Sequence, residues 1–105
     1  EMGNDRLLAY ALGGRAEVRL LKEDYDLARV LASRAADAFR ALQDVASEAH
    51  ALRLYGQALH GQQAYTPALE TLSSAIALAQ DSAVRRIVGE CGLARARCLI
   101  DLGDK

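Results

Sequence analysis

The chain has 105 residues, of which 51% are hydrophobic, and a formal net charge of −1. This length fits one domain with a modest core, and the charge gives no electrostatic reason to expect nucleic acid or an anionic membrane as a partner. No apolar run approaches membrane-spanning length, and the first residues lack the features of a signal peptide, so we expect a cytoplasmic protein. Ala and Leu are abundant, Trp is absent and Pro occurs once, which favours helix over strand.

Apolar residues spaced three and four apart predict five helices with short joints. The expected ranges, in chain order, are about residues 4–22, 26–42, 45–61, 67–79 and 83–102. Asp26 and Thr66 are expected to cap the second and fourth helices, because their side chains can accept hydrogen bonds from first-turn N–H groups. Pro67 is tolerated at the first helical position, where an N–H group would lack a partner anyway.

The third and fourth segments carry small and large residues at defined spacings. The pattern is Leu52-x2-Tyr55-Gly56-x2-Leu59, then Ala68-x3-Leu72, then Ala75. Small residues allow two helix backbones to approach closely, and the large residues fill the gaps between them. The pattern resembles the tetratricopeptide repeat. The resemblance implies an all-α fold, a right-handed α-solenoid built from antiparallel helix hairpins, here with five helices.

The same pattern recurs along the chain. Matched residues 40 positions apart include the pairs Tyr25 and Tyr65, Ala28 and Ala68, and Ala35 and Ala75. This period is longer than the 34 or so residues usual for tetratricopeptide repeats, and is similar to the longer repeats of MalT-type bacterial transcription activators. We expect a single domain, residues 1–105, with repeats over about residues 4–43 and 44–81 and a partial or capping repeat over residues 82–105.

The fifth segment has two interpretations. It could be the cap that closes a short solenoid, or the chain could be a piece of a longer array, which is the interpretation we favour. In the second case the apolar side that carries Leu93, Leu99 and Ile100 should be partly exposed and should promote self-association.

Few residues carry reactive chemistry. Cys91 and Cys98 are seven apart on one helix, about 10 Å by helix rise, which is too far for a disulfide between them, so we expect buried structural thiols. His50 and His60 should point in different directions and lie on the surface, without acidic or Cys residues at metal-ligand spacing. Glu17, Glu48, Glu70 and Glu90 are expected on solvated helix faces. We therefore expect no enzyme activity, no metal and no cofactor.

Binding is the remaining function. In tetratricopeptide domains the first helix of each repeat lines a concave groove that accepts a peptide or a partner helix. The resemblance implies groove-facing residues at Glu17, Arg53, Gln57, His60 and Arg97. We expect a protein–protein interaction scaffold without intrinsic catalysis. Two alternatives stay open: an effector-sensing or self-associating regulatory segment of a bacterial transcription regulator, and a metal or redox module based on the two Cys and two His residues.

Overall fold

The computed structural model describes the backbone of residues 2–82 and 85–103 and the side chains of residues 4–80 and 92–103. Within these ranges the chain forms five helices and no strand, which confirms the predicted all-helical fold. The helices are α1 (Met2–Leu21), α2 (Tyr25–Ala41), α3 (Val45–Gly61), α4 (Tyr65–Ser82) and α5 (Arg85–Gly103). Over the described residues, none of these helices is both long enough and apolar enough to cross a membrane.

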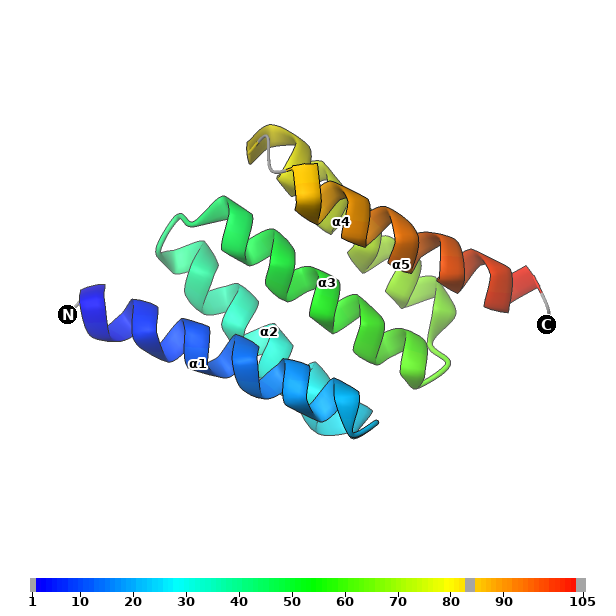
Figure 1. Ribbon diagram of the computed structural model, residues 1–105, viewed down its shortest axis with the longest axis horizontal. Coiled ribbons are helices and arrows are strands. Elements are labelled where there is room, and N and C mark those ends of the chain that lie inside the picture. Colours follow the sequence, from blue (N-terminus) through cyan, green and yellow to red (C-terminus); the bar gives the residue numbers. More distant parts are fainter. Residues whose placement is uncertain (1, 83–84, 104–105) are drawn as a thin grey trace.

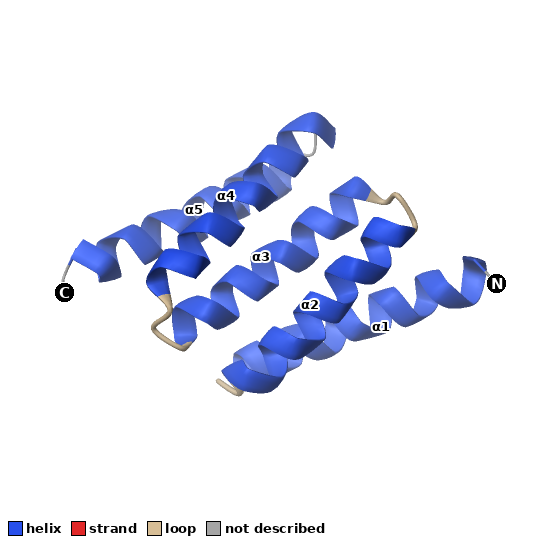
Figure 2. Ribbon diagram, turned by 180° about the vertical axis from the view of Figure 1, so that it is seen from behind, coloured by secondary structure: helices blue, strands red, loops and turns tan. Residues whose placement is uncertain are grey.

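The helices lie in two layers. In Figure 1, α1, α3 and α5 run in the same direction through one layer, and the connecting helices α2 and α4 run back behind them. Figure 2 shows the same arrangement from behind. Each helix packs against the next one in the chain, and α3 also contacts α1 and α5. By contrast, no Cα atoms of α2 and α4 lie within 8 Å of each other in the described part of the chain.

The three described joints between helices have the same backbone geometry. The left-handed residues are Glu23 (φ 60°), Gln43 (φ 58°) and Gln63 (φ 63°). The N–H group of the next residue donates a hydrogen bond to the preceding helix, for example Asp44 to the Phe39 carbonyl at 3.0 Å. This is the Schellman end of a helix, for which glycine is the usual left-handed residue. This geometry recurs every 20 residues, so two successive helices with their joints span the 40-residue spacing of the sequence pattern.

The joints also decide where the next helix begins. Asp24 and Asp44 directly follow the left-handed residues, and they accept hydrogen bonds from the N–H groups of Leu27 at 3.4 Å and Ser47 at 3.2 Å. The predicted caps at Asp26 and Thr66 are therefore wrong, because both residues already lie inside the first turn of α2 and α4.

Alanine dominates the core. Of the buried hydrophobic residues, the largest that are fully buried are Leu31, Leu54, Leu72 and Cys98, and most of the others are Ala. Such small side chains let helices pack closely. Gly56 lies at such a close approach, because a Cβ atom added there would lie 2.7 Å from two carbon atoms of the Leu72 side chain on α4.

Replacing Gly56 or Ala68 by Leu should overpack the α3–α4 contact and cost about 1–3 kcal/mol of stability. Gly13→Ala is the matched control, since an added Cβ there meets nothing within 4 Å. That change should be stabilising by up to about 1 kcal/mol through helix propensity. Urea unfolding followed by circular dichroism gives all three values. Unchanged stability in both Leu variants would contradict the close approach.

A second stability prediction concerns Asp44, which caps α3 and also accepts a hydrogen bond from Arg6 of α1 at 2.9 Å. Partial burial by itself would raise the pKa of Asp44, but the hydrogen bonds from Ser47 and the Arg6 guanidinium outweigh it and lower this pKa below the ordinary value. Asp44→Ala should therefore cost about 1 kcal/mol or more at neutral pH. Asp24→Ala should cost less, because its capping bond is longer and its side chain more exposed.

The pH dependence of this effect follows from the lowered pKa. Asp44 stabilises the fold fully above the pKa of an unfolded Asp, about 3.9. The contribution disappears as the pH falls through the lower pKa of the folded protein. The difference in unfolding free energy between wild type and Asp44→Ala should thus shrink in acid. A difference that stays constant down to complete protonation would show that the carboxylate charge is not involved.

Candidate partner-binding surface

The five residues predicted to line a groove all lie in the layer formed by α1, α3 and α5. Glu17 is on α1, Arg53, Gln57 and His60 are on α3, and Arg97 is on α5. These three helices run in the same direction and contact one another through α3. The layer therefore brings residues from separate parts of the sequence onto neighbouring helices.

Glu17 and Arg53 are joined through His50. The His50 Nε2 atom lies 2.9 Å from a carboxylate oxygen of Glu17, and the Arg53 Nη2 atom lies 3.3 Å from His50 Nδ1. Because Arg can only donate, Nδ1 acts as the acceptor and Nε2 carries the proton that is donated to Glu17. The cluster links α1 to α3 through one of the two carboxylate oxygens of Glu17.

His60 makes the corresponding link on the other side of α3. Its Nε2 atom pairs with the Asp101 carboxylate of α5, and its ring packs edge-on against Tyr65 at a centroid distance of 5.7 Å. The prediction that the two histidines point in different directions is confirmed. Both side chains are partly exposed, 31% for His50 and 22% for His60, and each is paired with a carboxylate of a neighbouring helix.

Gln57 and Arg97 lie outside these two clusters. Gln57 is half-buried on α3, and Arg97 is exposed on α5. His50 and Asp101 also belong to the candidate binding surface, although the sequence pattern does not predict their contacts with Glu17 and His60. Asp101 lies 41 positions after His60, close to the repeat length, so a search for partners one repeat apart could have found it.

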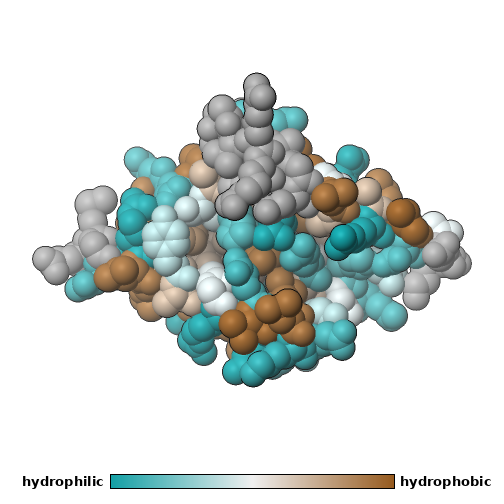
Figure 3. All heavy atoms as spheres, viewed as in Figure 1, coloured by the Kyte–Doolittle hydropathy of each residue, from teal (hydrophilic) through white to brown (hydrophobic). Residues whose placement is uncertain are grey.

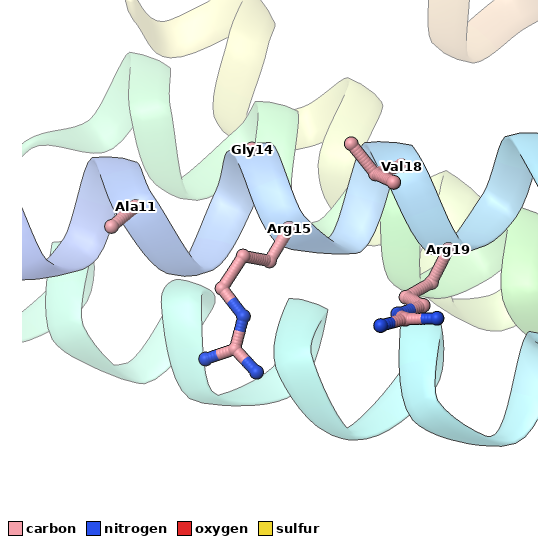
Figure 4. Close-up of a pocket in the computed structure, with 5 residues that line it drawn as sticks. All are labelled: Ala11, Gly14, Arg15, Val18 and Arg19. Carbon is pink, nitrogen blue, oxygen red and sulfur yellow. The ribbon is translucent and has the colours of Figure 1, made fainter.

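Two hollows lie on the described part of the surface. One open hollow of about 320 Å³ lies over α1, lined by Ala11, Gly14, Arg15, Val18 and Arg19 (Figure 4). A second, of about 210 Å³, lies between α2 and α3, lined by Arg29, Val30, Ser33 and Tyr55. Neither of these two hollows is lined by any of the five predicted residues.

Two acidic or sulfur-bearing side chains are buried. Glu48 is 7% exposed and accepts a hydrogen bond from Arg40 Nε at 2.9 Å, so its predicted place on a solvated face is wrong. Cys98 is buried as predicted, and its thiol donates to the Tyr65 carbonyl at 3.5 Å. The side chain of Cys91 lies outside the described residues. Across the described side chains, no three His, Cys, Asp or Glu residues are close enough together to hold a metal ion.

Comparisons of this chain with protein-family models, with curated proteins and with solved structures each gave no match.

Cys98 should react slowly with thiol reagents in the folded protein. Burial, together with the nearby Asp101 carboxylate, raises the pKa of the Cys98 thiol, and the thiolate is the reactive form. Its modification should begin at a higher pH than that of an ordinary cysteine and should become fast on denaturation. Peptide mapping by mass spectrometry would separate Cys98 from Cys91. Rapid modification of Cys98 in the native state would contradict its buried position.

Proposed function

We propose that this chain is a protein–protein interaction scaffold with the architecture of a tetratricopeptide-like α-solenoid. Its partner is a peptide or a helix of another protein, bound on the outer face of the α1, α3 and α5 layer. The observation that carries the proposal is the difference between the two layers. α3 contacts both α1 and α5, whereas α2 and α4 are held apart. A stack of hairpins with this asymmetry curves toward the layer in closer contact.

The side chains of this face support a partly charged partner. Glu17 is half exposed beside His50, while Arg53 and Arg97 supply positive charge further along the layer. Such a mixture gives orientation and specificity to an extended peptide through charge complementarity. We infer no catalytic role, because a binding surface of this kind requires no nucleophile, metal or cofactor. In this proposal the protein works in the cytoplasm, and neither nucleic acid nor membrane is a direct partner.

The alternative is a regulatory segment of a bacterial transcription regulator that senses an effector or associates with itself. The observation that favours it is the apolar surface of α5, where Leu93 is 65% exposed, Leu99 45% and Ile100 64%. This matches the partial exposure predicted for these three residues. Large exposed apolar patches commonly mark interaction sites.

The groove assignment predicts that charge reversal on the α1, α3 and α5 layer weakens partner binding. Arg53→Glu with Arg97→Glu should reduce affinity by about tenfold or more if the partner contacts both residues. Arg97→Glu alone should have part of the effect, and it leaves the Arg53–His50 hydrogen bond intact. Partners would be selected from a peptide array with the wild-type protein, and affinities then measured by calorimetry. Melting curves would show whether the half-buried Arg53 also affects stability.

The control variant is Arg29→Glu with Arg34→Glu, two exposed positions on α2. Arg29 lines the hollow between α2 and α3, so this variant tests the opposite layer. It should leave binding nearly unchanged. If the selected partners bind the groove variant as tightly as wild type and fail on the α2 variant, the binding site is on the α2 and α4 layer.

A further inference from the structure

α1 is apolar on two opposite faces. One face is buried against α2 and α3 and carries Ala9, Leu12 and Ala16, which are at most 6% exposed. The second face carries Leu7, Ala11, Gly14, Val18 and Leu21. At 100° per residue, the centre of this second set lies on the far side of the helix from the first. An apolar helix face is usually covered by another part of a protein, and α1 has two such faces.

The second face, here called the α1 stripe, is open to solvent. Leu7 is 69% exposed, Val18 47% and Leu21 85%, and Ala11 and Gly14 between them are exposed as well. Figure 3, which shows the view of Figure 1, displays brown apolar surface along α1. The spacings are four, three, four and three residues, which is the a/d repeat of a coiled-coil seam. The hollow lined by Ala11, Gly14 and Val18 lies on the stripe and allows close approach of another helix.

The stripe has charges of opposite sign on its two sides. Glu17 lies along one edge, in the position that coiled coils call g, and Arg15 lies along the other edge, in an e position. Lys22 is the first residue after α1, and it continues this second edge because its N–H group still donates to the Val18 carbonyl at 3.1 Å. In a parallel pair of helices, a g residue faces the e residue five positions later in the partner. Glu17 of one helix would then face Lys22 of a second identical helix. The Glu17 oxygen that does not bind His50 is available for this contact.

We propose that two copies of this chain pair through the α1 stripe as parallel helices related by a two-fold axis. The arrangement is isologous, so the Glu17–Lys22 contact forms twice. Because the stripe lies opposite the core face of α1, the remaining helices of each copy lie on the far side from the partner. α1 also lies at the edge of its layer, beside α3 only (Figure 1).

Repulsion between like charges disfavours the alternative ways of pairing two copies. Antiparallel pairing of two α1 stripes places e residues opposite e residues, and so brings Arg15 and Lys22 of the two copies together. Pairing through the apolar face of α5 is also disfavoured, because Arg95 and Arg97 flank that face on both sides. Two heptads give an interface at the small end of specific contacts, below about 1,200 Å² in total. The dimer is therefore weak and forms with increasing concentration.

The first test compares two valines of equal exposure. Val18 in the α1 stripe and Val30 on α2 are both 47% exposed. Sedimentation equilibrium of the full chain should show a monomer–dimer equilibrium for wild type. Val18→Glu should raise the dissociation constant by about tenfold or more, because it buries like charges at the seam. Val30→Glu should leave it unchanged, and melting curves would show that both variants fold.

The second test reverses the charges that orient the pair. Lys22→Glu alone places two acidic pairs across the interface, and Glu17→Lys alone places two basic pairs there, so each variant should dimerise more weakly than wild type. A mixture of the two restores both opposite-charge contacts and should form a mixed dimer. Raised salt should weaken the charge effects.

Three outcomes of these experiments would contradict the proposed dimer or its arrangement. A strict monomer at high concentration, or a dimer that is insensitive to Val18→Glu, would overturn the proposed dimer. A dimer that needs Val18 but gains nothing from mixing the two charge variants would overturn the parallel arrangement. A dimer lost on Leu93→Glu and kept on Val18→Glu would place self-association on α5 instead. Binding of a peptide on the α1, α3 and α5 layer is measured separately and is not decided by these outcomes.

Discussion

The close packing of α3 against its neighbours is the constraint on which the rest of the structure depends. α3 contacts all four other helices. This is sterically possible because its inward positions are small, with Ala51, Gly56 and Ala58 all buried. Leu72 of α4 occupies the space where a Gly56 side chain would be. Larger residues at such positions would separate the helices and open both layers.

The joints convert this local packing into a regular stack. Each of the three left-handed residues reverses the chain after a helix of similar length, so α1, α3 and α5 share one direction. Polar contacts then tie the neighbouring members of this layer together. His50 joins α3 to α1 through Glu17, and His60 joins α3 to α5 through Asp101. Both links are partly exposed, so they position the layer more than they stabilise it.

α1 differs from α3 because a neighbour covers only one of its sides. Positions 14 and 18 of α1 correspond to Leu54 and Ala58 of α3, which are 2% and 0% exposed. Leu54 lies in a cluster with residues of α1 and α2, whereas Gly14 and Val18 belong to the exposed α1 stripe. The polar outer face of the layer and the apolar stripe thus have different chemistry, which is why we assign a charged peptide to one and a second copy to the other.

Sequence by itself determined the helices and the small residues between them. The range of α3, residues 45–61, was predicted without error, because apolar periodicity and helix propensity are local properties. The caps at Asp24 and Asp44 could be identified only from the structure. The left-handed residues before them are Glu23 and Gln43, whereas the sequence sign of such a helix end is a glycine. The contacts of His50, His60 and Glu48 could also be identified only from the structure. They depend on how far neighbouring helices are shifted along one another, which is set by packing between residues distant in sequence.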